Sequence, residues 1–424
     1  MSASDPADAI TVESLARAEW LKHGSLAELL SVLNRHGEEA RAIGGAVRDS
    51  LLGKDPVEID VATTALPPEV IRRVEAAGFK AVPTGIDHGT MTVVIEGHPF
   101  EVTTLREDVE TYGRKAKVRF GRDWKADAER RDFTINALSV SPDGTVHDYV
   151  GGLADLAARR VRFIGDPATR IAEDYLRILR FFRFHAAFGE GLPDAAGLSA
   201  AIAARDGMDI LSRERVRMEL IKLIMAPHAV RTLAVMAEAG LLGRVLGGVP
   251  LLAGFSNMTR LEAGLGLAAD PVRRLGALAV QVAEDAERLW QRLRLSNAEH
   301  QRLESMGDGW WRVAPTLEAD TGRALLYRLG PQRFTDRVLL AWARSQSGVT
   351  DAAWHELATL PARWRAPAFP LKAADFTKRG VPKGPQLGAA LRAAEEAWIA
   401  ADFPAAKDAL AQIAEAAIRD TGPA

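Results

Sequence analysis

The sequence predicts an α+β protein, in which a mixed portion of strands and helices precedes a longer portion built of helices. Strand-like segments, with alternating polar and apolar residues or short apolar runs, are concentrated in about the first 150 residues. From about residue 169 onward, Leu, Ala and Arg recur at helical spacing as far as the C-terminus. A chain of 424 residues is too long for one hydrophobic core, so we expect about two to four domains.

Composition and charge narrow the possible functions. Hydrophobic residues at 47% and charged residues at 26% are typical of a globular protein. The net charge of -2 means that any nucleic-acid binding needs a local basic surface. The absence of cysteine excludes disulfides, thiolate zinc sites, iron–sulfur clusters and a cysteine nucleophile. Neither a signal peptide nor an apolar run of roughly 18 residues is present, so we expect a cytoplasmic enzyme without a membrane partner.

The elements expected in the first portion alternate between helix and strand. In chain order they are a helix from Ser25 to about Gly37, a strand at residues 42–43, a helix over 46–52, a strand over 58–63, and a hairpin of strands 90–96 and 99–105. Ser25 and Glu28 have the spacing of a capping box. In the helical portion, seven tryptophans between Trp290 and Trp398 are expected to fill cores, with base stacking as the alternative.

A glycine pair stands where the first strand turns into a helix. Gly44 and Gly45 let backbone N–H groups approach a phosphate, because glycine has no side chain and a helix N-terminus favours anions. Arg48, in the helix that follows, can add positive charge. Alone, such a pair predicts no more than a turn.

Three carboxylates are candidates for metal chemistry. Glu58 and Asp60, two apart on the expected strand, point to one face and can hold a divalent cation against a triphosphate. The alternative is a solvated strand face. If the strand over residues 99–105 lies beside them, Glu101 becomes a third carboxylate that can ligate metal or accept a proton from an attacking hydroxyl.

A charged cluster precedes the helical portion. Arg130 and Arg131 can grip a polyphosphate, and Asp132 and Asn136 can bond a ribose or fix these arginines. An internal ion-pair network is the alternative, and residue chemistry alone leaves both open.

A ridge of charged residues follows on one predicted helix, with Asp174, Arg177, Arg180 and Arg183 at steps of three. Adenine and cytosine present an amino donor beside a ring-nitrogen acceptor, whereas guanine and uracil present a carbonyl acceptor beside an N–H donor. An aspartate that accepts, next to an arginine that donates, matches the first two bases and opposes the others. The alternative is a basic helix face in which Asp174 pairs with Arg177.

In this order the segments resemble the class II nucleotidyltransferases, the family of bacterial CCA-adding enzymes and poly(A) polymerases. The resemblance covers about residues 42–222. It is carried by the segments GGAVRDSLLG, EIDVATTA, RRDFTINAL, HDYVGGLADL, IGDPATRIAEDYLRILRFFRF and LSRERVRMELIK. Residues 371–391 look like the tail segment of CCA-adding enzymes.

The resemblance implies a mixed head sheet followed by helical domains. The implied parts are a partly flexible N-terminal segment (1–24), a catalytic head (25–160), a neck with the base-recognition helix (161–225), a body (226–350) and an RNA-binding tail (351–424). The implied activity is Mg²⁺-dependent transfer of a nucleoside monophosphate to an RNA 3′ hydroxyl.

Residue roles are implied only where this sequence matches the motifs. The triphosphate would be held by Gly44, Gly45 and Arg48, the metals by Glu58 and Asp60, and the nucleotide by Arg131. Asp174 and Arg177 would read the base, with support from Arg180 and Arg183. The family usually has Asp at both metal positions, so Glu58 is a departure that puts metal spacing, rate or metal preference in doubt.

Two segments favour CCA addition to tRNA, using CTP and ATP. Residues 84–90 look like the CCA-adding version of a stretch that is basic in poly(A) polymerases, and residues 105–124 look like a full-length loop, which implies that the terminal adenosine is added. The nine histidines form no cluster of the His-Asp phosphohydrolase type, so no phosphatase activity is expected. The alternatives are a poly(A) polymerase and a catalytically silent RNA-binding protein of the same fold, the latter favoured only by Glu58.

Overall fold

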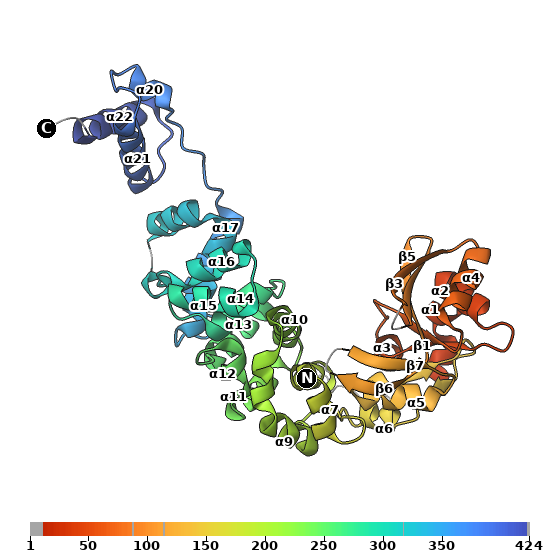
Figure 1. Ribbon diagram of the computed structural model, residues 1–424. Coiled ribbons are helices and arrows are strands. Elements are labelled where there is room, and N and C mark those ends of the chain that lie inside the picture. Colours follow the sequence, from red (N-terminus) through yellow and green to blue (C-terminus); the bar gives the residue numbers. More distant parts are fainter. Residues whose placement is uncertain (1–11, 87–88, 113–114, 317, 422–424) are drawn as a thin grey trace. The chain divides into compact units, whose positions relative to one another are not determined.

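The computed structural model of the chain describes residues 12–86, 89–112, 115–316 and 318–421. The chain divides into two compact units, Met1–Val245 and Leu246–Ala424. All the strands of the described residues lie in the first unit, and the second is helical (Figure 1). The predicted α+β class, with strands first and helices after, is confirmed. No helix among the described residues has the length and apolar character needed to cross a membrane.

Three short helices open the described chain, namely η1 (Val12–Arg17), α1 (Glu19–Lys22) and α2 (Gly24–Leu33). The predicted capping box is wrong. Because α2 already begins at Gly24, Ser25 lies inside the first turn, and its hydroxyl donates to Glu96 Oε2 at 3.4 Å. The helix also ends earlier than expected, because the Asn34 amide donates to the backbone oxygens of Leu30 and Ala40.

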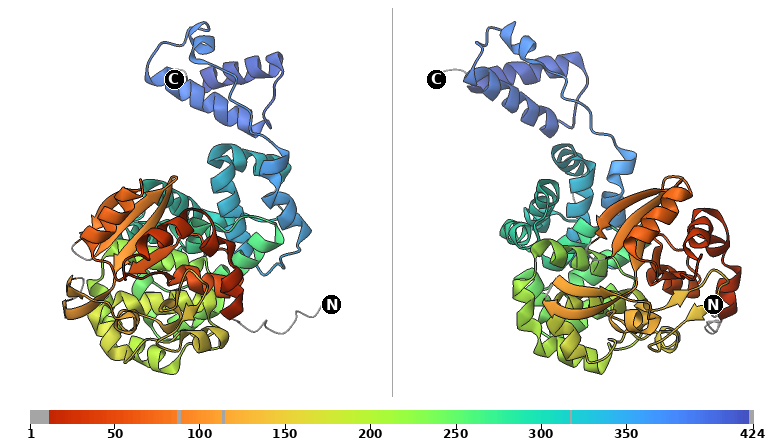
Figure 2. Two further views of the ribbon diagram at one scale, coloured as in Figure 1. Left: turned by 90° about the vertical axis from the view of Figure 1, so that its right-hand side faces the viewer. Right: turned by 45° about the vertical axis from the view of Figure 1, so that its right-hand side comes forward.

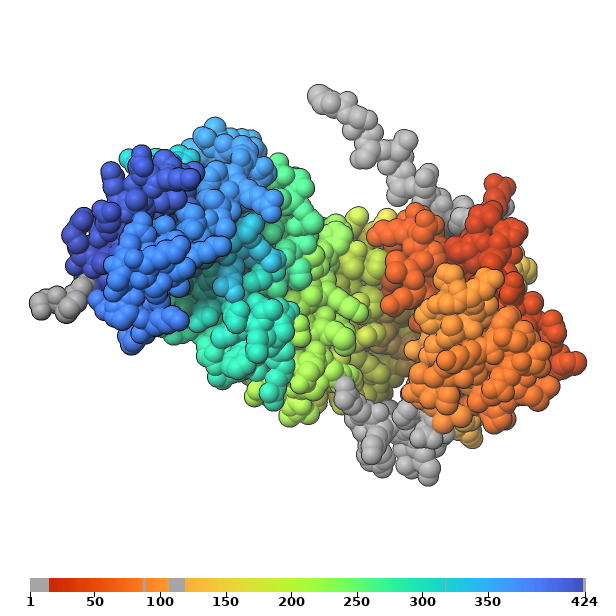
Figure 3. All heavy atoms as spheres, turned by 90° about the horizontal axis from the view of Figure 1, so that it is seen from above, coloured from red at the N-terminus to blue at the C-terminus, as the bar shows by residue number. Residues whose placement is uncertain are grey.

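A seven-stranded mixed sheet forms the core of the first unit, in the order β3-β4-β5-β2-β1-β8-β9. Its strands are β1 (Ala40–Ile43), β2 (Asp60–Thr63), β3 (Lys80–Gly85), β4 (Thr90–Ile95), β5 (His98–Thr104), β8 (Ser139–Val140) and β9 (Val146–His147). The predicted hairpin is confirmed as β4 and β5. Figure 2 shows the curved sheet from two further sides, and Figure 3 shows, in orange, the part of the unit that contains β3, β4 and β5.

The pairing of β2 with β5 is the one parallel pairing within this sheet as described, and it places Asp60 opposite Glu101. The neighbouring Val61 and Val102 point the other way and are fully buried. The expectation that Glu101 lies beside the acidic strand is therefore confirmed.

The predicted loop at residues 105–124 contains a hairpin of its own. Its strands are β6 (Arg106–Tyr112) and β7 (Lys115–Phe120). Residues 113–114, which separate the two strands in the sequence, and residues 87–88, within the stretch compared with poly(A) polymerases, lie outside the described residues.

Short helices surround the sheet and lead into the helical part of the first unit. They are α3 (Gly45–Leu51), α4 (Pro67–Ala76), α5 (Trp124–Glu129), η3 (Thr134–Asn136) and α6 (Gly152–Ala157), followed by α7 (Pro167–Glu173), α8 (Leu176–Phe188), α9 (Ala195–Ala203), η4 (Arg205–Ile210), α10 (Arg213–Ile224), α11 (Ala229–Glu238) and α12 (Leu241–Leu246). The ring of Phe133, just before η3, packs on Phe163 at 4.8 Å and on Phe184 of α8 at 5.3 Å between centroids. The part of the first unit that contains the sheet and the helical part that follows it therefore share one aromatic core.

The second unit consists of helices. They are α13 (Leu252–Gly264), α14 (Pro271–Ala279), α15 (Ala283–Leu293), α16 (Asn297–Gly307), η5 (Trp310–Arg312), α17 (Ala319–Arg344), α18 (Ala352–Ala358), α19 (Leu360–Arg363), α20 (Ala373–Thr377), α21 (Pro385–Ala400) and α22 (Lys407–Thr421). Three of the tryptophans, Trp342, Trp354 and Trp398, are buried as predicted. Trp311 is 53% exposed, so the prediction does not hold for that residue.

Candidate functional site

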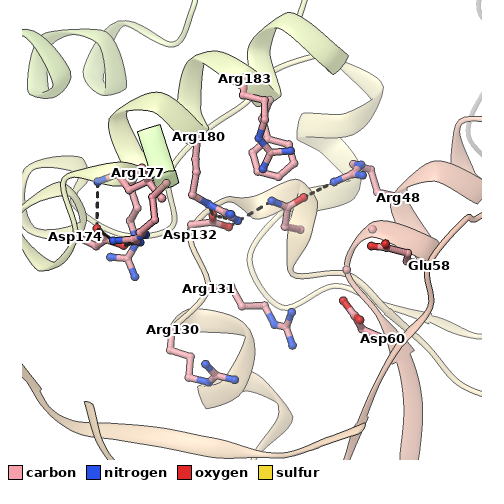
Figure 4. Close-up of a pocket in the computed structure, with 16 residues that line it drawn as sticks. Arg48, Glu58, Asp60, Arg130, Arg131, Asp132, Asp174, Arg177, Arg180 and Arg183 are labelled. Atoms are coloured by element: carbon pink, nitrogen blue, oxygen red, sulfur yellow. Dashed lines mark hydrogen bonds and ion pairs between the residues drawn. The ribbon is translucent and has the colours of Figure 1, made fainter. Parts of the chain in front are cut away.

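A cavity of about 600 Å³ in the first unit gathers the predicted site residues. It is lined by Gly44, Gly45, Arg48, Glu58, Asp60, Arg130, Arg131, Asp132, Asn136, Asp174, Leu176, Arg177, Arg180, Arg183, Phe184 and Arg215 (Figure 4). Every predicted site residue except Glu101 is in this lining. Glu58 and Asp60, two of the four carboxylates in this lining, face its arginines, which is the charge arrangement expected for a metal-bound polyphosphate.

The glycine turn borders one end of the cavity. Gly44 has a φ of 68°, a conformation that side chains rarely adopt, and it links β1 to α3. A Cβ atom at Gly44 would lie 3.6 Å from the backbone oxygen of Asn136 and 3.8 Å from Arg131 Nη1. A side chain at position 44 would therefore occupy the space beside Arg131, which faces Glu58 and Asp60.

Asp60 is the first residue of β2, and Glu58 lies two residues earlier, outside the strand. The prediction that both lie on one strand is wrong for Glu58, because the pairing with β1 begins only at Asp60. Both still line the cavity. Burial raises the pKa of Asp60. The positive charge of Arg131 lowers this pKa, and the negative charge of Glu58 raises it further.

Glu101 supports this acidic group from the neighbouring strand. Partial burial, followed by the charge of Asp60, raises the pKa of Glu101, against a lowering effect of Arg106. Carboxylates that repel one another in this way would be stabilised by a cation. Within the described part of the chain, no three His, Asp or Glu side chains form a ready metal cluster. Glu58 and Asp60 instead fit an ion that also takes substrate and water oxygens as ligands.

Arg48 is buried at the glycine end of the cavity. Its guanidinium pairs with Asp49 at 2.9 Å and donates through Nη1 to Asn136 Oδ1 at 2.6 Å. It also lies over the ring of Phe188, 4.0 Å from the centroid. These three contacts fix the position of the Arg48 guanidinium and therefore of its positive charge.

A chain of hydrogen bonds and ion pairs runs from Arg48 across the cavity, drawn as dashed lines in Figure 4. Asn136 Nδ2 donates to Asp132 Oδ1 at 3.3 Å, and Arg180 Nε donates to Asp132 Oδ2 at 2.7 Å. Burial alone would raise the pKa of Asp132, but Arg180 and these hydrogen bonds hold it below its usual range. The chain links the glycine side of the cavity to α8.

Arg130 and Arg131 share one acidic partner. Asp127, in α5, lies 2.6 Å from Arg130 Nη2 and 3.1 Å from Arg131 Nη2. The predicted alternative of an internal ion-pair network is therefore present, and both arginines line the cavity as well. One carboxylate between two guanidinium groups leaves net positive charge for an anion.

The predicted ridge is correct for three of its four residues. Arg177, Arg180 and Arg183 follow α8, but Asp174 precedes it with an extended backbone at φ -156°. Its Oδ1 accepts from the backbone N–H of Leu176, and aspartate is favoured at such helix starts over helix interiors. The helix therefore breaks at Asp174.

The predicted alternative pairing of Asp174 with Arg177 is also wrong. Arg215 of α10 pairs with Asp174, at 2.5 Å from Oδ2 and 3.3 Å from Oδ1. Arg177 pairs with Glu173 and donates to the backbone oxygen of Arg170 at 2.6 Å. Asp174 and Arg177 nevertheless line the same cavity.

Sequence reasoning missed Arg215, Phe184 and Leu176 as cavity residues. Arg215 belongs to the segment LSRERVRMELIK, which carries part of the family resemblance, but nothing in the spacing of that segment places it beside Asp174. Phe184 has the spacing of an ordinary apolar residue in an amphipathic helix. The contact of Arg183 with its ring, 3.9 Å from the centroid, depends on tertiary packing.

Comparison with known proteins adds to this geometry. Residues 40–162 match the family described as "Poly A polymerase head domain", and residues 198–253 match "Probable RNA and SrmB-binding site of polymerase A". The CCA tRNA nucleotidyltransferase 1, mitochondrial, of Danio rerio is 34% identical over 413 residues, which are 92% of this chain and 90% of the relative. The CCA-adding enzyme of Limosilactobacillus fermentum is 32% identical over 373 residues, 86% of this chain and 89% of the relative.

Solved structures agree with these relatives. The Bacillus stearothermophilus CCA-adding enzyme in complex with CTP superimposes with a TM-score of 0.72 at 29% identity, covering 92% of this chain and 96% of that one. The Thermotoga maritima CCA-adding enzyme complexed with tRNA shares the fold, with a TM-score of 0.70 at 17% identity over 96% of this chain and 98% of that one. The resemblance inferred from the order of the sequence segments is confirmed, and the chain belongs to the family of CCA-adding enzymes, the CCA tRNA nucleotidyltransferases.

Proposed function

We propose that this protein transfers CMP and AMP from CTP and ATP to the 3′ end of tRNA, and so builds or repairs the terminal CCA. The observation that carries the proposal is the single cavity in which a glycine turn, two carboxylates and a ladder of arginines meet. A nucleotide fits such a cavity with its triphosphate on the arginines and its base toward α8. The membership of the family supports the choice of substrates.

Nucleotidyltransferases of this kind use a divalent metal ion. We assign Mg²⁺ to Glu58 and Asp60, because carboxylate oxygens beside phosphate oxygens are its preferred ligands. When bound, the ion supplies charge neutralisation for the attacking and leaving oxygens. Glu58 sits before the strand and carries one more methylene than aspartate, so its carboxylate has more freedom to reach such an ion.

The residues of the chain would orient the reacting groups. Gly44, Gly45, Arg48 and Arg131 hold the triphosphate, so that the α-phosphorus lies near the carboxylates. The RNA 3′ hydroxyl forms the new P–O bond, the bond to the β-phosphate breaks, and pyrophosphate leaves. Glu101, whose pKa is raised by partial burial and by Asp60, accepts the hydroxyl proton in this scheme.

Base selection is assigned to Asp174 and Arg177, with Arg180 and Arg183 in support. The carboxylate of Asp174 accepts hydrogen bonds and the guanidinium of Arg177 donates them, which matches cytosine and adenine. Arg215, which donates to both oxygens of Asp174, holds this carboxylate in one orientation. Glu173, through its ion pair, holds the guanidinium of Arg177 in place.

We propose four domains: a head at residues 25–160, a neck at 161–225, a body at 226–350 and an RNA-binding tail at 351–424. The head and neck contain the nucleotide cavity, and the body and tail would hold the tRNA.

We also propose that the protein acts in the cytoplasm, although the relative from Danio rerio is named as mitochondrial. A tagged copy followed by cell fractionation tests that location.

The deciding experiment is incorporation of labelled CTP and ATP, separately and together, into a tRNA transcript that lacks its CCA end. Two cytidines, then one adenosine, then arrest are expected with Mg²⁺. Long adenosine tails without use of CTP would instead identify a poly(A) polymerase.

A pair of variants tests whether the site is catalytic. Asp60→Ala should abolish incorporation while tRNA binding persists. Glu75→Ala, which removes an exposed carboxylate of α4 outside the cavity, should leave both unchanged. A wild-type protein that binds tRNA without incorporating either nucleotide would be a silent RNA-binding protein.

A further inference from the structure

The second unit contains a buried arginine that lacks a close acidic partner. Arg337, in α17, is 9% exposed, and its guanidinium donates to the backbone oxygen of Ser305 at 2.8 Å and to Ser305 Oγ at 3.2 Å. Its ion pair with Asp308 spans 3.8 Å, and the Asp308 side chain is largely exposed. A buried charge that meets mainly neutral partners is costly.

The other buried arginines of the described chain are neutralised at short range. Arg273, in the same unit, has Glu262 and Asp336 each at 3.0 Å. In the first unit, Arg41 pairs with Glu39 at 2.9 Å, Arg48 with Asp49 at 2.9 Å and Arg73 with Glu69 at 2.6 Å. Arg337 therefore departs from the way in which this chain otherwise accommodates buried guanidinium groups.

Arg337 also borders an open cavity of about 240 Å³. This cavity is lined by Asp308, Gly309, Arg312, Val313, Thr321, Ala324, Leu325, Arg328 and Arg337. Arg312 makes no ion pair with any described residue. Burial lowers the pKa of Arg337, the charge of Asp308 opposes this, and the charge of Arg312 adds to the lowering. Arg328 pairs with Glu396 at the surface. Positive charge thus exceeds negative charge around the cavity.

The backbone leaves room between the two central arginines. Gly309, at the start of η5, has a φ of 81°, which favours glycine. A Cβ atom there would lie 3.7 Å from Arg337 Nη1 and 3.8 Å from Arg312 Cδ. The side chains of Arg312 and Arg337 therefore both approach the position that a side chain at residue 309 would occupy.

We propose that this cavity, here called the arginine cavity, binds a phosphate group between Arg312 and Arg337, and that the source of the group is the sugar–phosphate backbone of RNA. Guanidinium groups bind phosphate through two parallel hydrogen bonds, and the hydroxyl of Thr321 lines the same space. This contact would lie in the unit without the nucleotide cavity. It deepens the proposed function, because it places one RNA contact in the body, and it rests on that function for the identity of the RNA.

The test compares two neutralising variants of the full chain. Arg312→Gln removes a cavity arginine that has no ion pair with a described residue. Arg333→Gln is the matched control, because Arg333 lies in the same helix as Arg337, bonds to the Gln301 side chain and is absent from the cavity lining. The dissociation constant for a tRNA transcript is measured for each at several salt concentrations.

For one lost phosphate contact, the slope of log K against log salt should become shallower by about 1 in Arg312→Gln, and it should stay at the wild-type value in Arg333→Gln. Incorporation at saturating tRNA should not change in the control Arg333→Gln. A failure of the wild type to incorporate nucleotide would overturn the proposed function, while the salt slopes would still test this contact.

Inorganic phosphate, added in calorimetric titrations, distinguishes the source. If Arg312→Gln loses a phosphate-binding heat that Arg333→Gln retains, and the RNA slopes are equal, the anion site stands with free phosphate as its ligand. Equal slopes and equal phosphate heats in the two variants would overturn the proposal. Arg337→Gln, provided that its circular dichroism matches the wild type, should repeat the result of Arg312→Gln.

Discussion

Replacing Asn136 by leucine should impair use of the nucleotide without disturbing the fold. Asn136 is buried, and its Oδ1 accepts the 2.6 Å hydrogen bond from Arg48 Nη1. Leucine has a similar volume and no acceptor, so Arg48 keeps Asp49 as a partner but loses its anchor on the cavity side. The same change removes the donor to Asp132, whose other oxygen holds Arg180.

The expected size follows from the chemistry of this bond. Hydrogen bonds to a charged group contribute about 1.5–3 kcal/mol, and about 1.4 kcal/mol corresponds to a factor of ten. If Arg48 holds the triphosphate, kcat/KM for CTP should fall by about 10- to 100-fold. A decrease of similar size in kcat/KM is expected for ATP, because CTP and ATP share the triphosphate.

Steady-state incorporation into tRNA lacking CCA measures this effect, with circular dichroism melts as a check of the fold. Asn34→Leu is the control, because Asn34 is a hydrogen-bonded asparagine of the same unit that lies outside the cavity. It should lower stability and leave kcat/KM within about twofold. Folded Asn136→Leu protein with wild-type kcat/KM for CTP would refute the assignment of Arg48 and its anchor.

Three further outcomes are expected. Asp174→Ala should lose discrimination against UTP and GTP, and Arg215→Gln should lose part of it; unchanged nucleotide selectivity in Asp174→Ala would contradict the hydrogen-bond argument. Chelation of divalent ions should stop incorporation, and added Mg²⁺ should restore it, while tRNA binding measured by filter retention persists throughout. Burial, followed by the charge of Arg231, lowers the pKa of His185 to about 4. The unfolded chain then binds the extra proton, so the free energy of unfolding should fall by up to about 1.4 kcal/mol per pH unit as pH drops from about 6.5 to 4. The difference between urea melts of the wild type and His185→Gln measures this slope, and a difference that is constant with pH would contradict it.

The sequence predicted the elements whose signal is local. The alternation in residues 90–104 and the two-residue turn predicted the β4–β5 hairpin, and the glycine pair predicted the turn into α3. The gathering of the carboxylates and arginines could be expected only from the family resemblance, because their positions along the chain are far apart.

Competing local contacts explain what the sequence did not predict. Asp174 fits a helical step of three, but its carboxylate is used at the start of α8 and by Arg215 instead. Glu58 continues the strand alternation, yet no strand pairs with it. Arg215 reaches Asp174 because α10 packs against α8. The spacing of residues in the sequence does not predict this packing.

The aromatic core around Phe133 bears on how this protein can be cut into pieces for study. The rings of Phe163, Phe181 and Phe184, which a catalytic head ending near residue 160 would lack, lie 4.8, 6.3 and 5.3 Å from that of Phe133. Such a fragment would present a bare aromatic surface to water and would be prone to aggregate. A longer fragment that ends at Val245 keeps those rings covered, and it is the piece in which nucleotide binding can be measured without the second unit.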